Sequence, residues 1–243
     1  MQIYYAIGDV HGRDDLLLTL LTRIVADHTW RHPDKKATLV YVGDYIDRGL
    51  RSREVIDRVK RGVPGFETIC LKGNHEDLML ACLTTTDIDV WGMWLGNGGE
   101  QTAASFGLRI ESDDDCDPVA LAKALGPERL RWLDTLKLYH RTDEYLFVHA
   151  GIVPGRPLAQ QLEKDLIWIR HAFLDSDVDH GCIVVHGHTP AEEPELRRNR
   201  IGIDTGATWN GKLTAVCLGE DTGPRFLTVT GEPGPGPWVM SPE

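Results

Sequence analysis

Short clusters of acidic, imidazole and amide side chains recur along the chain, each with glycine beside them. Carboxylates, imidazoles and amides bind divalent cations or exchange protons, and glycine lets the backbone approach a ligand closely. Each cluster taken alone is weak, because a Gly-Asp turn or a buried histidine is common in any protein. The clusters are Gly8-Asp9-Val10-His11-Gly12, Gly43-Asp44-Tyr45-Ile46-Asp47-Arg48-Gly49, Gly73-Asn74-His75-Glu76, His149-Ala150-Gly151 and His186-Gly187-His188-Thr189.

The elements around these clusters explain how they could meet. Apolar runs predict a strand directly before each cluster, and helical periodicity between the first strands predicts a largely parallel sheet. The carboxyl ends of parallel strands share one edge, so the clusters are expected at a single point. Further strands with few helices between them predict a second sheet packed on the first. The expected strands cover residues 3–7, 38–42, 66–71, 145–149, 182–186, 200–204, 213–218 and 226–230.

A set of buried carboxylates, imidazoles and one amide needs cations to neutralise it. Mixed nitrogen and oxygen ligands without thiolate suit Mn, Fe or Zn. The number of ligands exceeds the needs of one ion. Two ions about 3.5–4 Å apart are a standard device for phosphate chemistry. The pattern therefore predicts a dinuclear metal site.

Composition limits the remaining classes. The 243 residues suit one large α/β domain, and the net charge of −11 with scattered cations argues against binding a nucleic-acid backbone. The five cysteines have no CxxC spacing, which indicates a reducing compartment. No apolar stretch is long enough to span a membrane, and the N-terminus does not read as a signal peptide. A cytoplasmic protein is expected.

The ordered motifs GDVHG, GDYIDRG, GNHE, HAG and HGHT resemble the metal-dependent phosphoprotein phosphatase family of the calcineurin-like metallophosphoesterases. They are most similar to the small bacterial and phage serine/threonine phosphatases. The resemblance implies a four-layer α/β/β/α sandwich of two mixed sheets. We expect residues 1–230 to form a single domain, with 91–138 as a helical rim or cap within it. Residues 231–243 are expected to be a mobile tail rich in proline and glycine.

The resemblance also implies the metal ligands. Asp9 and His11 would hold the first metal, and Asp44 would bridge both metals. The second metal would be completed by Asn74, His149 and His188. Mn²⁺ is the expected metal, with Fe, Zn or Ni as alternatives. His186 is expected to support the site from the core instead of binding metal.

Four further side chains match residues that act on the substrate in the family. Arg48 and, by a looser match, Arg170 would contact the phosphate oxygens. His75 would protonate the leaving oxygen, with Asp47 orienting it. The sequence assigns no role to residues 97–99, for which a structural turn is the simpler interpretation.

The expected activity is hydrolysis of phosphate monoesters by a hydroxide that two metals activate. Phosphoserine and phosphothreonine in a protein or peptide are the expected substrates, and phosphotyrosine is left open. One alternative is a nucleotide phosphohydrolase, such as an enzyme that cleaves diadenosine tetraphosphate symmetrically; the intact aspartate of Asp47-Arg48-Gly49 disfavours it. Another alternative is a non-catalytic phospho-binding module on the same fold. A metal-dependent nuclease fits the acidic balance poorly.

Overall fold

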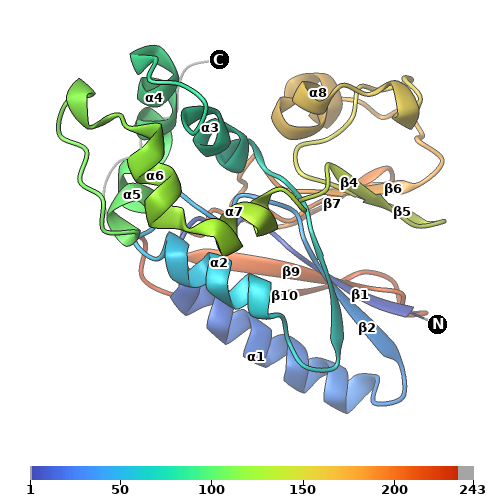
Figure 1. Ribbon diagram of the computed structural model, residues 1–243. Helices are drawn as coiled ribbons and strands as arrows, with labels where there is room; N and C mark the ends of the chain where they lie inside the picture. The colour runs from blue at the N-terminus through green and yellow to red at the C-terminus, as the bar shows by residue number, and fades with distance from the viewer. Residues whose placement is uncertain (1, 235–243) are drawn as a thin grey trace.

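The computed structural model describes residues 2–234, which fold into two five-stranded sheets with helices on their outer faces (Figure 1). The strands are β1 Gln2–Ile7, β2 Lys36–Tyr41, β3 Phe66–Cys70, β4 Tyr139–Arg141, β5 Tyr145–Val148, β6 Ile183–His186, β7 Glu195–Leu196, β8 Arg200–Gly202, β9 Lys212–Leu218 and β10 Arg225–Thr230. The α-helices are α1 Asp14–Arg31, α2 Ser52–Arg61, α3 Asn74–Cys82, α4 Ile88–Trp94, α5 Glu100–Ser105, α6 Pro118–Leu125, α7 Pro127–Leu133, α8 Glu163–Trp168 and α9 His171–Leu174. Short helical turns are η1 Leu95–Gly99, η2 Asp113–Asp115 and η3 Leu158–Gln160.

The first sheet brings three strand ends level with one another. Its order is β10-β9-β1-β2-β3, and β1, β2 and β3 are parallel. Ile7 pairs with Tyr41, and Tyr41 pairs with Cys70. The loops that follow these three strands therefore start side by side at one edge.

The second sheet repeats this arrangement. Its order is β4-β5-β6-β8-β7, with β5, β6 and β8 parallel and both outer strands antiparallel to their neighbours. The short outer strands β4 and β7 were not predicted from the sequence. They have three and two residues, too few to show an alternating apolar pattern.

Alternating side chains build the layers. One face of the first sheet packs against α1, α2 and the helices after them, in a core that includes Tyr5 and Ile7. The opposite face, with Ala6, packs against Phe147 of the second sheet. The outer face of the second sheet, with Leu146, packs against α8 and α9. The expected four-layer α/β/β/α sandwich is confirmed.

The predicted strands all form, with bounds that differ by up to two residues at either end. The segment 91–138 is mainly helical and contains α5, α6 and α7, although α4 starts earlier, at Ile88. Of the expected tail, 231–234 follow β10, whereas 235–243 lie outside the described residues. No helix within residues 2–234 has the length and apolar character to cross a membrane.

A single buried carboxylate joins the second and third strand ends. Glu76, in the first turn of α3, is fully buried. One of its oxygens accepts hydrogen bonds from the backbone N–H groups of Asp44 and Gly73, at 2.9 and 3.0 Å. Its other oxygen accepts from the N–H of Tyr45 at 2.9 Å. Because these N–H groups are buried, no water can replace the carboxylate.

We predict that Glu76→Ala lowers the free energy of unfolding by about 3 kcal/mol or more, since each unpaired buried N–H costs about 1–3 kcal/mol. Urea unfolding in the presence of a chelator measures this effect without a metal contribution. Glu54→Ala is the control, because Glu54 is exposed on α2. Equal stability of the two variants would contradict the structural role of Glu76.

Candidate active site

The loops after five parallel strands converge on one buried point. Asp9 and His11 follow β1, Asp44 follows β2, and Asn74 follows β3. The second sheet supplies His149 after β5 and His188 after β6. All six side chains are buried, with exposed fractions from 0 to 6%. The two sheets are thus packed so that both sets of strand ends face each other.

The first group of donor atoms lies around one oxygen of Asp44. The Oδ2 atom is 3.5 Å from His11 Nε2 and 3.8 Å from His75 Nε2. The Nδ1 atom of His11 lies 2.8 Å from the carbonyl oxygen of Ile46, to which it can donate. That hydrogen bond places the proton of the neutral ring on Nδ1 and leaves an electron pair on Nε2.

The second group lies around the other oxygen of Asp44. The Oδ1 atom is 3.4 Å from His149 Nε2. The amide oxygen of Asn74 is 2.9 Å from both His149 Nε2 and His188 Nδ1. Nδ1 of His149 lies 2.9 Å from the carbonyl oxygen of Val42 and can donate to it, which orients the ring. One carboxylate therefore stands between two sets of nitrogen and oxygen donors, as a bridging ligand would.

Asp9 shows that the donor set is incomplete without a cation. Its Oδ2 accepts a hydrogen bond from the N–H of His188 at 2.9 Å. Its Oδ1 is buried and has no hydrogen-bond partner among the described residues. Asp204, which follows β8, is also buried and adds a second negative charge beside Asp9. Buried oxygens of this kind fit divalent cations well.

The electrostatics agree with this fit. Burial and the neighbouring carboxylates raise the pKa of Asp9 well above its ordinary value, and burial raises the pKa of Asp44 to about 7. Burial lowers the pKa of the His11 and His188 imidazoles, and lowers that of His149 to about 4. The imidazoles are therefore neutral, while the positive charges of Arg48 and Arg170 only partly offset the effect of burial on the carboxylates. Divalent cations would meet both conditions.

The backbone is strained where it carries these side chains. Within residues 2–234, the non-glycine residues with positive φ are His11, Asp44, Asp47, Arg48 and His188. Their φ values lie between 45 and 71°, a region that ordinary side chains rarely adopt. Such strain persists only where the surroundings enforce it, and it concentrates at functional sites.

A buried histidine–aspartate pair adjoins the donor groups. His75 Nδ1 lies 2.7 Å from Asp47 Oδ2, and both side chains are at most 1% exposed. The other oxygen of Asp47 accepts from Thr102 Oγ1 at 2.7 Å and from Trp94 Nε1 at 3.1 Å. Burial raises the pKa of Asp47 and lowers the pKa of His75. The pair leaves Nε2 of His75 facing the Asp44 carboxylate.

Arg48, in the loop after β2, also contacts the donor groups. Its Nη1 is 2.7 Å from His11 Nε2, and its guanidinium carbon lies 4.8 Å from the ring centroid of Trp209. A cation over an indole face is attracted by the ring. Its backbone N–H donates to the carbonyl oxygen of Gly98 at 3.0 Å. Arg170, directly before α9 on the side of the second sheet, has its Nε 3.3 Å from His188 Nε2.

Every site residue predicted from the sequence lies at this point. His186 is buried behind it, with its Nε2 3.5 Å from an Arg200 nitrogen, in agreement with a supporting place in the core. Sequence reasoning missed Asp204, although Asp204-Thr205-Gly206 after a strand has the same pattern as the other clusters. It also missed Thr102 and Trp209, whose contacts with Asp47 and Arg48 have no signature in the sequence.

Two mixed sheets in a four-layer sandwich, with a buried Asp/His/Asn centre at their strand ends, define a metallophosphoesterase. The profile of the calcineurin-like phosphoesterases matches residues 4–217. The chain therefore belongs to the calcineurin-like phosphoesterase family, and it is a metal-dependent phosphoesterase with buried His/Asp clusters suited to a dinuclear centre.

Similar proteins divide between two activities. The chain is 26% identical to the asymmetrical bis(5'-nucleosyl)-tetraphosphatase PrpE of Anoxybacillus flavithermus, over 90% of this chain and 91% of the relative. It is 27% identical to serine/threonine-protein phosphatase 1 of Salmonella typhimurium, over 88% of this chain and 91% of the relative. A crystal structure of a candidate diadenosine tetraphosphatase has the same fold, with a TM-score of 0.66 and 20% identity over 96% of this chain and 95% of that one.

Gly98 provides a test of how Arg48 is positioned. Its φ is +96°, and a Cβ there would lie 2.6 Å from the backbone nitrogen of Arg48. We predict that Gly98→Ala displaces Arg48 and lowers kcat/KM for p-nitrophenyl phosphate about 100-fold, as small misplacements of reacting groups do. Metal content by elemental analysis should not change. Gly96→Ala is the matched control, because a Cβ at Gly96 meets no atom within 4 Å; equal activity of both variants would contradict the prediction.

Proposed function

We propose that this protein is a phosphoprotein phosphatase that hydrolyses phosphoserine and phosphothreonine, with phosphotyrosine as a further substrate class. The observation that carries the proposal is the His75–Asp47 pair, held at 2.7 Å with His75 Nε2 3.8 Å from Asp44. A serine or threonine alkoxide is a poor leaving group and needs a proton as the bond to phosphorus breaks. A buried acid beside the metal ligands supplies that proton.

The donor atoms support an assignment of the metal ligands. Asp9 and His11 would hold one ion, and Asp44 would bridge both, because its two oxygens face different imidazoles. The second ion would be held by Asn74, His149 and His188. When bound, two such ions lower the pKa of water and offset the charge of a phosphoryl group. Mn²⁺ is the metal that we propose, because neutral imidazole and carboxylate donors suit it.

Side chains of the protein would bind the phosphoryl group and donate the proton. Arg48 lies beside His11 and Arg170 beside His188, and both would hold the phosphoryl oxygens. Their guanidinium groups offer paired N–H donors that match phosphate geometry. Asp47 keeps His75 in one orientation, and Thr102 and Trp94 keep Asp47 in place. For the acid role the pair must hold two protons, one between Nδ1 of His75 and Asp47 and one on Nε2, and the raised pKa of Asp47 favours the second proton. His75 would then pass the Nε2 proton to the departing oxygen.

A second candidate is hydrolysis of a dinucleoside polyphosphate. It is supported by the similarity to PrpE, which bears the asymmetrical activity, whereas the sequence suggested symmetrical cleavage as the alternative. The half-buried indole of Trp209, which lies against the Arg48 guanidinium, could also stack on a base. A nucleotide leaves as a stable phosphate anion, so this reaction needs the His75 proton far less.

The proposed metal ligands can be tested by substitution of Asp44. Asp44→Asn should weaken Mn²⁺ binding about 100-fold or more, because it removes the charge that both ions would share. Isothermal titration calorimetry of the metal-free protein measures this directly. Asp134→Asn is the control, since Asp134 is exposed. An unchanged Mn²⁺ affinity and stoichiometry in Asp44→Asn would exclude the bridging role.

The proposed role of His75 as the acid can be tested by its substitution. His75→Asn should lower kcat for a phosphoserine peptide by about 10²–10⁴ and affect p-nitrophenyl phosphate much less, because nitrophenolate leaves without a proton. The same assay should include phosphothreonine and phosphotyrosine peptides and diadenosine tetraphosphate. Rapid cleavage of the dinucleotide with slow peptide turnover would favour the second candidate. Equal losses on alkyl and aryl phosphates would remove His75 from the acid role.

A further inference from the structure

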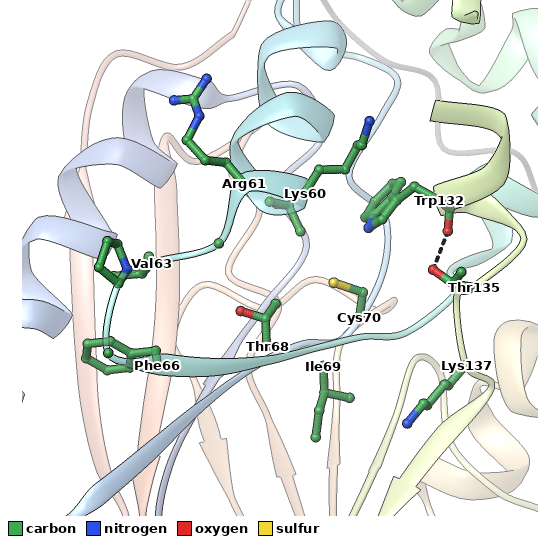
Figure 2. Close-up of a pocket in the computed structure, with 14 residues that line it drawn as sticks. Lys60, Arg61, Val63, Phe66, Thr68, Ile69, Cys70, Trp132, Thr135 and Lys137 are labelled. Carbon is green, nitrogen blue, oxygen red and sulfur yellow. Dashed lines mark hydrogen bonds between the residues drawn. The ribbon is translucent and has the colours of Figure 1, made fainter. Parts of the chain in front are cut away.

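A groove lies away from the metal centre, at the open edge of the first sheet (Figure 2). Its volume is about 700 Å³. The walls are the end of α2 with the turn 61–65, the outer side of β3, and the segment 132–137. None of the residues proposed to bind metal or phosphate lines it.

The groove exposes a strand edge that already accepts a partner at one end. β3 is the last strand of its sheet and pairs only with β2. At its carboxyl end, the N–H of Lys137 donates to the carbonyl of Cys70, and the N–H of Lys72 donates to the carbonyl of Lys137. At the other end, the N–H of Phe66 is bonded to Val63. Between these ends, exposed Thr68 lies on the uncovered part of the edge.

The charged side chains that line the groove are all positive in a chain whose net charge is −11, while the exposed Glu67 of β3 lies outside the lining. The groove is lined by Lys60, Arg61 and Lys137, and no Asp or Glu lines it. Lys60 has an ion-pair partner, Glu128, at 3.9 Å, but Glu128 is 82% exposed, so the pair is weak. Figure 2 shows Lys60 and Arg61 on one side of β3 and Lys137 on the other.

This distribution of charge selects among ligands. A small anion such as phosphate would need cations that converge on one point, whereas these cations lie on both faces of the sheet. An added strand sends successive side chains to opposite faces, so acidic residues in it would reach Lys60 and Arg61 on one face and Lys137 on the other. The half-buried ring of Trp132, packed 5.2 Å from Tyr45 between ring centroids, offers an apolar contact beside them.

We propose that this groove binds an extended acidic segment of a partner protein, which adds to the edge of β3 as a further strand. Backbone hydrogen bonds to the uncovered edge would supply affinity, and the three cations would supply the preference for acidic residues. The site is separate from the metal centre, so the proposal does not depend on which phosphate ester is hydrolysed.

The probe is a fluorescein-labelled peptide of glutamate pairs separated by single valines, which presents acids on both faces of a strand. One control peptide has lysine at every glutamate. A second control keeps the glutamates but is N-methylated at every residue, which removes the N–H donors from both edges of the peptide, so that it cannot pair as a strand. Fluorescence anisotropy should show binding of the acidic peptide alone, and amide chemical shifts in ¹⁵N-labelled protein should change at Phe66–Ile69.

The variant Lys60→Glu/Arg61→Glu/Lys137→Glu should weaken binding of the acidic peptide about tenfold or more. Its matched control is Lys123→Glu/Lys164→Glu/Arg198→Glu, which makes the same charge change at exposed sites elsewhere. Both should hydrolyse p-nitrophenyl phosphate at the native rate, which verifies that they fold. Equal binding of acidic and N-methylated peptides, equal weakening in both variants, or no binding at millimolar peptide would each overturn the proposal.

Discussion

The structure depends on keeping one carboxylate, that of Asp44, buried between two sets of imidazoles. Its oxygens lie 3.5 Å from His11 and 3.4 Å from His149, which come from different sheets. A buried negative charge is costly unless cations or hydrogen-bond donors surround it. The packing of the two sheets places neutral imidazole nitrogens around it, and the remaining charge is what divalent cations would balance. The metal centre therefore forms only when the two sheets pack together, because its ligands come from both of them.

The supporting contacts act mainly on the backbone that holds this group. Glu76 accepts hydrogen bonds from three backbone N–H groups, in the turn that carries Asp44 and in the turn that precedes Asn74. Positive φ angles at Asp44 and the adjoining turns aim the side chains inward, at an energetic cost that the Glu76 hydrogen bonds and the packed sheets offset. A metal centre prepared in this way needs little rearrangement when substrate arrives, which favours catalysis by preorganised charge.

The two regions of interest share one strand, β3. The carboxyl end of β3 leads into Asn74 and His75 and therefore into the buried centre. The outer edge of β3 faces a groove whose charged lining residues are positive. The buried centre would recognise the phosphoryl group, which is common to many substrates. The groove at β3 would recognise the protein that carries the phosphoryl group, so that substrate specificity would not depend on the small area around the phosphate.

The sequence by itself determined the strand–loop–helix order and the polar clusters at the strand ends, because each cluster follows an apolar run and contains glycine, which is a local pattern. Through family resemblance it also predicted six of these residues as metal ligands. It also indicated the His75–Asp47 pair through family resemblance. Only the tertiary structure decided which groups surround these residues: Thr102, 55 positions from Asp47, and Trp209 above Arg48 leave no local trace. The open edge of β3 was equally hidden. Contacts between distant segments arise from how layers pack, and packing is a property of the folded chain as a whole.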